Sequence, residues 1–291
     1  MGKSKCRLLR EILKREDTIL VPGCYDALSG KILKQAGFPL IYMSGSAVTA
    51  SLLGKSDVGL LTMSEMVSQA RNIVNATNLP LICDADTGYG NPINVMRTVQ
   101  EFERVGVAGI HLEDQVMPKR CGHFEGKAIV TTEEMIGKIK AAISAREDKD
   151  FLIIARTDAR SVLGLEEAMR RAHVYFETGA DMLFIEAPES KEELETIASE
   201  FKGVPLMVNM VEGGKTPIVD FSYLKERGFK IVLYPTTSIR IVMEALRAFA
   251  LYLKEEKGTK GLESEMVSFE MRNQILELNE VEEMERKFMQ G

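Results

Sequence analysis

The feature that most constrains the fold is a set of eight short apolar runs, rich in Ile, Val and Leu, spread along the chain. They are TILVPG (18–23), PLIYMSG (39–45), PLICDAD (80–86), GIHLEDQ (109–115), FLIIARTD (151–158), DMLFIEA (181–187), PLMVNM (205–210) and IVLYP (231–235). Each run is almost continuously apolar, which is typical of parallel strands covered on both faces. Segments with helical periodicity lie between them, at 63–77, 94–106, 131–145 and 165–179 among others.

This alternation of strand and helix predicts either a closed parallel barrel or a doubly wound open sheet. Two observations favour the barrel: the strands number eight, and no GxGxxG motif follows the first strand. We therefore expect a single α/β domain over residues 1–291, a (β/α)8 barrel of the TIM type. Its C-terminal helical extension, about 238–291, is longer than one closing helix needs. We expect it to pack on a neighbouring subunit or to cap the barrel.

The bulk composition excludes several classes of protein. The chain is 45% hydrophobic and 27% charged, as in a soluble globular protein, and its net charge of −6 includes no basic stripe for nucleic acid. No apolar run is long enough to span a membrane. The four cysteines (Cys6, Cys24, Cys83 and Cys121) are far apart and lack metal-type spacing, so we expect reduced thiols and a cytoplasmic location.

Polar side chains follow six of the eight predicted strands, where this fold places its chemistry. Asp84 and Asp86 form the sharpest pair, because at spacing i, i+2 on a strand both carboxylates point to one side. With Glu113 at the end of the next strand they make a cluster of oxygen ligands, which suits Mg²⁺ or Mn²⁺. The alternative is a set of structural salt bridges in the barrel mouth.

The loop after the fourth strand, PKRCGHFEGK (118–127), is the second candidate feature. Cys121 is flanked there by Lys119, Arg120 and His123, positive groups that we expect to lower the pKa of the thiol and to hold an anion. Glycines in the loop give the backbone the freedom that closure requires. The alternative is a solvated basic loop with an incidental cysteine. For His111, inside the fourth strand, a core role is at least as plausible as orientation of a site group.

Five motifs resemble the isocitrate lyase and phosphoenolpyruvate mutase superfamily: DADTGYG (84–90), HLEDQ (111–115), KRCGH (119–123), ARTDA (155–159) and NMVEGG (209–214). The likeness runs in one register through nearly the whole chain, and it is strongest to the short-chain branch that includes 2-methylisocitrate lyase. KRCGH is specific for the lyase side. The resemblance therefore implies a metal-dependent carbon–carbon lyase of propionate catabolism, cleaving 2-methylisocitrate to pyruvate and succinate.

The resemblance also implies a role for each matching residue. The Mg²⁺ ligands would be Asp84, Asp86, Asp57 and Glu113, largely through water. Cys121 would be the catalytic acid, with Tyr42 contacting the substrate hydroxyl and Arg156 positioning the substrate. The residues implied to bind the di- or tricarboxylate substrate are Ser44, Gly45, Ser46, Lys119, Arg120, Gly122, His123, Glu186, Asn209, Arg240, Phe184, Leu233 and Pro235.

The choice of substrate depends on small differences. Phe184, Leu233 and Pro235 match the methylisocitrate form of the family, although one methyl group discriminates by only about 1–3 kcal/mol. Ser46, where the lyases usually have Gly, and the NMVEGG motif depart from that form. A carboxyphosphonoenolpyruvate-type mutase and an oxaloacetate decarboxylase stay open as alternatives, and a non-catalytic barrel is disfavoured because no ligand is lost. The family likeness further implies a homotetramer with C-terminal helices exchanged between subunits.

Overall fold

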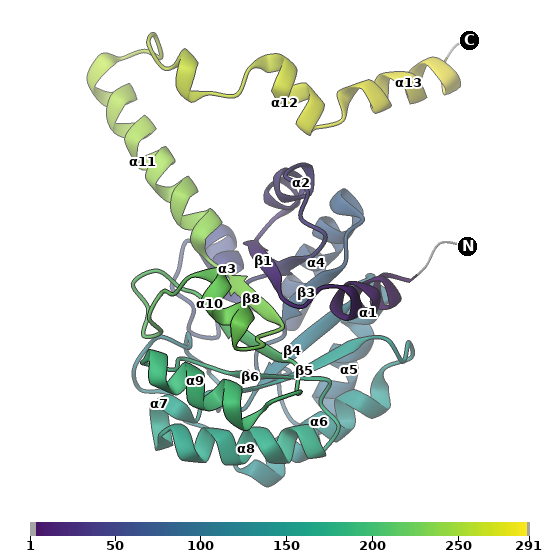
Figure 1. Ribbon diagram of the computed structural model, residues 1–291. Coiled ribbons are helices and arrows are strands. Elements are labelled where there is room, and N and C mark those ends of the chain that lie inside the picture. Colours follow the sequence, from purple (N-terminus) through teal and green to yellow (C-terminus); the bar gives the residue numbers. More distant parts are fainter. Residues whose placement is uncertain (1–3, 290–291) are drawn as a thin grey trace. The chain divides into compact units, whose positions relative to one another are not determined.

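The structure is a computed structural model that describes residues 4–289. Eight parallel strands form a closed barrel in sequence order, with β1 paired to β8 (Figure 1). The strands are β1 (Ile19–Cys24), β2 (Ile41–Met43), β3 (Leu81–Asp84), β4 (Gly109–Glu113), β5 (Leu152–Thr157), β6 (Met182–Ile185), β7 (Leu206–Asn209) and β8 (Ile231–Tyr234). Seven lie within the predicted apolar runs and β1 extends one residue beyond its run, so the predicted TIM-type (β/α)8 fold is confirmed.

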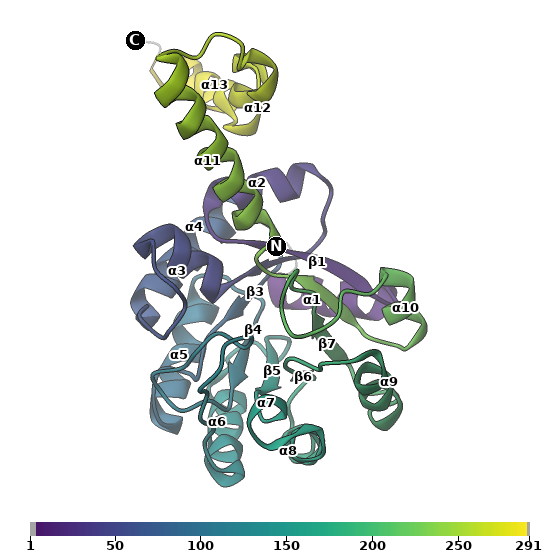
Figure 2. The ribbon, with the colours of Figure 1, turned by 90° about the vertical axis from the view of Figure 1, so that its left-hand side faces the viewer.

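Helices surround the strands, and Figure 2 shows α4, α5, α6 and α8 following one another around them. The helices before the last strand are α1 (Lys5–Arg15), α2 (Ala27–Gln35), α3 (Gly45–Leu53), α4 (Met63–Thr77), α5 (Pro92–Arg104), α6 (Thr132–Ala145), α7 (Arg160–Leu163), α8 (Leu165–Glu177), α9 (Lys191–Glu200) and α10 (Phe221–Glu226). Their ends follow local sequence rules. In α4, Thr62 and Glu65 form a reciprocal capping box, and Asn78 ends the helix in the left-handed conformation.

The apolar core has two layers, one between strands and helices and one inside the barrel. The inner layer includes Ile82, Ile154, Phe184 and Met207, and Leu9 of α1 belongs to it as well. Since successive side chains of a strand alternate between its faces, the residue two positions after an inner-layer residue also points inward. This rule delivers charged side chains to the barrel mouth at the carboxyl ends of the strands.

The chain divides into two compact units, Met1–Ile239 and Arg240–Gly291. The second contains most of α11 (Thr237–Glu256), then η1 (Glu263–Glu265), α12 (Phe269–Ile275) and α13 (Leu278–Phe288). No residue from 240 to 289 is fully buried, and Phe269 is 82% exposed and Phe288 73% exposed. The extension predicted from about residue 238 is therefore helical. Within residues 4–289 we find no helix long and apolar enough to cross a membrane.

Candidate active site

Side-chain alternation along the strands brings the predicted polar residues together in the barrel mouth. Asp84 lies two residues after Ile82, Arg156 two after Ile154, Glu186 two after Phe184 and Asn209 two after Met207, and each first member belongs to the inner core layer. All four polar residues are buried. The sequence rule that placed chemistry at the strand ends thus describes the arrangement of these side chains well.

A cluster of carboxylates around one lysine lies on the β3 side of the mouth. The Lys119 Nζ is 2.8 Å from Asp57 and 2.7 Å from Asp86, and all three side chains are buried. These carboxylates, with Asp84, raise the pKa of Lys119 well above its usual range although burial opposes them, so the ammonium stays charged. The family resemblance implies that Lys119 binds the substrate; in the structure it pairs with two of the predicted metal ligands.

Asp84 and Asp86 do not both lie on a strand, so the prediction that strand alternation turns their carboxylates to one side is wrong. The strand ends at Asp84, and Asp86 has a φ of 49°, in the left-handed region that non-glycine residues seldom adopt. The Asp86 backbone N–H donates to Asp84 Oδ1 at 3.0 Å, which fixes the turn. The two carboxylates therefore meet through a strained turn, not through strand alternation. Such strain is typical of functional sites.

These oxygen donors fit a magnesium ion that keeps part of its water shell. Both carboxylate oxygens of Glu113 are buried and lack a hydrogen-bond partner, and burial raises the pKa of this carboxyl well above its usual range. A buried carboxylate in this state is stabilised by a cation. Among residues 4–289 no three acidic, His or Cys side chains are arranged to hold one ion directly. Asp84, Asp86 and Glu113 would therefore hold Mg²⁺ largely through water. Asp57 forms an ion pair with Lys119 next to them.

Arg156 is the centre of the opposite side of the mouth. Its guanidinium makes two hydrogen bonds to Asp158, at 2.9 and 3.1 Å, and lies 3.3 Å from Glu113 and 3.4 Å from Glu186. The Arg156 Cζ is also 5.2 Å from the ring centroid of Phe184, a cation–π distance. Three carboxylates and one aromatic face thus fix the guanidinium, so it presents a rigid positive group to the mouth.

Tyr42 is paired with a histidine that the sequence reading left undecided. The Tyr42 hydroxyl is 2.7 Å from His111 Nε2, and the same nitrogen is 3.5 Å from Asp84 Oδ1. Burial lowers the pKa of His111 to about 4, so the ring is neutral at pH 7. His111 therefore belongs to the site, where it orients the Tyr42 hydroxyl.

The Cys121 loop spans the two sides of the mouth. On one side the Cys121 N–H donates to the Asp57 carbonyl at 3.1 Å. On the other, the Gly122 backbone lies so close to Arg156 and Glu186 that an added Cβ would sit 2.7 Å from each, and His123 Nε2 is 3.5 Å from Glu186. The part-buried thiol thus lies between the carboxylate–lysine cluster and the arginine.

The expected direction of the Cys121 pKa was wrong. The pKa of this thiol is raised to about 11, mainly by burial, and the carboxylates of Asp57 and Glu186 contribute in the same direction. The backbone of His123 and the charge of Lys119 oppose the rise. The main reason is burial, which disfavours the charged thiolate. The neighbouring cations do not offset it, because they are already paired with carboxylates. A thiol with this pKa is protonated at neutral pH, as a catalytic acid must be.

The remaining predicted residues fall into three groups. Ser44 caps α3 through a hydrogen bond from the Ala47 N–H, and Gly45 donates to Asp84. Both therefore border the carboxylate–lysine cluster, with Ser46 next in the helix. Asn209 donates to Glu186 at 2.9 Å, while Leu233 lies in the inner core and the Pro235 backbone packs against Gly23. The Arg120 side chain is exposed, and Arg240 is the first residue of the second unit, so their roles stay predictions.

Two buried residues of the site were seen in the sequence without being assigned a role. Asp158 holds Arg156, and Lys127 Nζ in turn contacts Asp158 Oδ1 at 2.8 Å. Both lie in segments already singled out, the end of the fifth strand and the Cys121 loop. Acidic residues outnumber basic residues at the predicted strand ends. This excess is the signal in the sequence that a further cation, such as Lys127, pairs with one of them.

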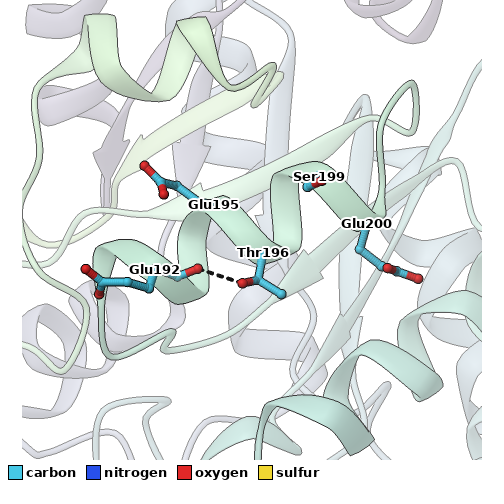
Figure 3. Close-up of a pocket in the computed structure, with 5 residues that line it drawn as sticks. All are labelled: Glu192, Glu195, Thr196, Ser199 and Glu200. Atoms are coloured by element: carbon cyan, nitrogen blue, oxygen red, sulfur yellow. Dashed lines mark hydrogen bonds between the residues drawn. The ribbon is translucent and has the colours of Figure 1, made fainter.

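A separate hollow lies on α9, lined by five of its residues (Figure 3). They are Glu192, Glu195, Thr196, Ser199 and Glu200. Glu195 pairs with Arg227 and Glu200 with His173, both at exposed positions, and Thr196 donates to the Glu192 carbonyl of its own helix. These contacts are those of an ordinary polar helix surface, in contrast to the buried and incompletely paired groups of the mouth.

The chain is similar to known enzymes in sequence and in fold. The family model described as phosphoenolpyruvate phosphomutase matches residues 9–253. The chain is 47% identical to 2,3-dimethylmalate lyase of Eubacterium barkeri, over 97% of this chain and 98% of the relative. It is 46% identical to 2-methylisocitrate lyase of Aeropyrum pernix, over 87% and 80% of the two chains. A crystal structure of oxaloacetate acetylhydrolase with 3,3-difluorooxalacetate has a TM-score of 0.93 at 35% identity, covering 98% of this chain and 97% of that one.

The resemblance read from the five motifs is thereby confirmed. Lyases are prominent among these relatives, in agreement with the predicted carbon–carbon lyase class. The match of the family model covers most of the barrel, including every strand. The chain belongs to the phosphoenolpyruvate mutase/isocitrate lyase superfamily.

Proposed function

We propose that this chain is a Mg²⁺-dependent carbon–carbon lyase that cleaves a 2-hydroxy-2-methyl acid between C2 and C3 and releases pyruvate. The observation that carries the proposal is the position of Cys121, whose loop contacts Asp57 on one side of the mouth and packs against Arg156 and Glu186 on the other. A protonated thiol at that point faces the carbon that must receive a proton once the bond has broken. Mn²⁺ would also suit the oxygen donors.

The reaction divides between the two sides of the mouth. A bound Mg²⁺ would supply positive charge to the C2 oxygen and the adjacent carboxylate. Tyr42, oriented by His111, contacts the C2 hydroxyl. As C2 becomes a carbonyl, the hydroxyl proton passes to the Tyr42–His111 pair, whose imidazole is neutral before the reaction. The electron pair of the C2–C3 bond passes to C3, where the fixed guanidinium of Arg156 stabilises the negative charge that develops. Cys121 then donates its proton to C3 and becomes a thiolate.

Two substrates fit this chemistry, and the sequence reading favours 2-methylisocitrate, which yields pyruvate and succinate. Its three carboxylates need more cationic partners than a malate-type substrate. In the mouth, the buried ends of Lys119, Lys127 and Arg156 already pair with carboxylates. This charge balance favours the dicarboxylate 2,3-dimethylmalate, which would give pyruvate and propionate. Similarity to 2,3-dimethylmalate lyase over nearly the full length of both chains supports the same choice.

The test is pyruvate release followed through lactate dehydrogenase, with Mg²⁺ and each racemic substrate in parallel. We expect turnover of both, with the larger kcat/KM for 2,3-dimethylmalate, and a loss of about 10³-fold in Cys121→Ser. EDTA should abolish the activity of the wild type. Full activity of Cys121→Ser would remove the acid role. Turnover only of oxaloacetate or of a phosphonate would place the chain with the decarboxylase, hydrolase or mutase members.

We also propose that the second unit packs on another copy of the chain, in a homotetramer with exchanged helices. Its helices expose apolar side chains such as Ile241, Leu246 and Phe269, and none of its described residues is fully buried. A second copy would cover these side chains at the same place on every subunit. A smaller species on light scattering for Phe269→Glu combined with Leu246→Glu would support this.

Because the four cysteines are free thiols, we propose a cytoplasmic location.

A further inference from the structure

The loop that carries Cys121 is a short ribbon with an irregular tip. Gln115 and Ile129 form an antiparallel bridge, and the Val116 N–H donates to the Ala128 carbonyl at 2.8 Å. The loop has little apolar anchorage, since Val116 in the stem is 43% exposed and Met117 and Phe124 beyond it are 39% and 41% exposed. A segment with few buried apolar contacts opens easily unless polar contacts hold it. The position of Cys121 therefore depends on hydrogen bonds to the loop backbone.

The first of these contacts comes from the side chain of Gln115. Its Nε2 donates to the Arg120 carbonyl at 2.8 Å, and its Oε1 accepts the Arg120 N–H at 3.0 Å. Gln115 is only 1% exposed. One amide thus satisfies both backbone groups of the residue immediately before Cys121, as a neighbouring strand would.

The second contact comes from Lys127, on the far side of Cys121. Its Nζ donates to the Gly122 carbonyl and to Asp158 Oδ1, the same carboxylate that holds Arg156. The buried end of Lys127 therefore ties the backbone after Cys121 to the arginine side of the mouth. Between these two contacts lies the Cys121 N–H, which donates to the Asp57 carbonyl.

We propose that Gln115 and Lys127 are positioning residues that hold the backbone on either side of Cys121 and so keep its thiol over the barrel mouth. The proposal rests on the proposed function for its catalytic meaning, because a held thiol matters only if Cys121 is the acid. Its structural content is independent of that reaction. Loss of either side chain frees the loop tip to leave the mouth while the barrel stays folded.

The test is the rate at which iodoacetamide alkylates Cys121, followed by peptide mass spectrometry at pH 8. Cys6, Cys24 and Cys83 are buried, so they provide internal references in the same protein. We expect Gln115→Ala and Lys127→Met each to raise the Cys121 rate at least tenfold. The reason is that an opened loop exposes the sulfur and returns its ionisation towards that of an ordinary thiol. Hydrogen exchange of the Arg120 and Cys121 amides should accelerate in parallel.

Lys215→Ala is the matched control, because the Lys215 ammonium contacts the same loop only through the exposed carboxylate of Glu125. A surface pair of this kind contributes little, so we expect an alkylation rate within twofold of wild type. Unchanged alkylation and exchange in both Gln115→Ala and Lys127→Met, with thermal melting as in wild type, would overturn the proposal. A variant that melts at a lower temperature, and whose three reference cysteines also react, has lost more than the loop contact. In that case Gln115→Glu is used, because glutamate still accepts the Arg120 N–H but cannot donate to the Arg120 carbonyl. We expect its Cys121 to react at a rate between those of wild type and Gln115→Ala.

Turnover separates a positioning role from a merely structural one. In Gln115→Ala we expect kcat for pyruvate release to fall at least tenfold with KM changed less than threefold, and Gln115→Glu to recover part of kcat. The two proposals fail differently. An active Cys121→Ser removes the acid role but leaves the alkylation result standing, whereas unchanged alkylation removes Gln115 and Lys127 as positioning residues whatever the substrate is.

Discussion

Glu113 and Asp114 are consecutive buried carboxylates, and their surroundings are opposite. Glu113 points into the barrel mouth, where neither of its oxygens has a hydrogen-bond partner. Asp114 points the other way and accepts four hydrogen bonds, from the Asp158 N–H, Thr157 Oγ1, Tyr175 Oη and an Arg171 nitrogen, at 2.8 to 3.1 Å. The last residue of β4 therefore belongs to an incomplete site, and the residue directly after the strand belongs to a completed hydrogen-bonded support.

The difference indicates how the mouth can hold strained groups and carboxylate oxygens that lack hydrogen-bond partners. The donors on Asp114 come from the end of β5 and from α8, and the Asp114 carbonyl accepts the Val130 N–H where the Cys121 loop returns. This layer fixes the segment that carries Arg156 and Asp158. Because the support is saturated with hydrogen bonds, the mouth can leave its own groups free for a metal and a substrate.

The support consists of Asp114 and the four groups that donate hydrogen bonds to it. The largest expected effect is on this support. Asp114→Ala removes the carboxylate that accepts hydrogen bonds from four buried donors, one of which is the guanidinium of Arg171. We expect the free energy of unfolding to fall by about 3–4 kcal/mol, as when one member of a buried ion pair is removed. Urea unfolding of the metal-free protein measures it. Glu167→Ala removes a half-exposed partner of the same Arg171 and should cost less than about 1 kcal/mol. Equal losses in the two variants would contradict the comparison.

Glu113→Gln should show the reverse pattern. We expect metal affinity to fall about 10–100-fold by titration calorimetry with Mn²⁺, with pyruvate release falling alongside. Stability of the metal-free protein should not fall at neutral pH. Because burial raises the folded-state pKa of Glu113, its contribution is complete below the unfolded pKa and is lost as pH rises through the folded value. The amide cannot ionise and avoids that loss. A variant that is markedly less stable at pH 8 would show that Glu113 belongs to the support.

The thiol of Cys121 gives the mouth a pH signature. The acid works in its protonated form, and its pKa is raised to about 11. Cleavage should therefore persist as pH rises and decline only towards pH 11. At pH 10 this gives about 30 times more protonated thiol than an ordinary cysteine would have. The pH profile of kcat, with substrate saturating, measures it, and Gln115→Ala should decline earlier. A wild-type decline that begins near pH 8.5 would mean that the thiol is not shielded in the working enzyme.

The sequence predicted the barrel and most of the mouth because both depend on short-range rules. Apolar runs define the strands, and alternation places Asp84, Arg156 and Glu186 inward. What it missed depends on long-range pairing. Lys119 meets Asp57, 62 residues away, and the carboxylates there keep the neighbouring charges from lowering the pKa of Cys121. Asp114 follows Glu113 directly in HLEDQ, and only its partners at the end of β5 and on α8 reveal it as support.

The smallest expected effect isolates one donor of the support. Thr157→Val removes the 2.8 Å hydrogen bond to Asp114, and with it the 3.2 Å hydrogen bond that the hydroxyl accepts from the Ala159 N–H, at nearly the same side-chain volume. We expect a loss of about 1–2 kcal/mol in unfolding free energy, since the acceptor is charged but keeps three other donors. Turnover should stay within twofold, because the Asp158 N–H still holds the end of β5. Thr196→Val on α9, where the hydroxyl bonds to its own helix, is the control and should change stability by less than about 0.5 kcal/mol. A large loss of turnover in Thr157→Val at unchanged stability would mean that Asp114 tunes the chemistry directly, and the division between mouth and support would then fail at β5.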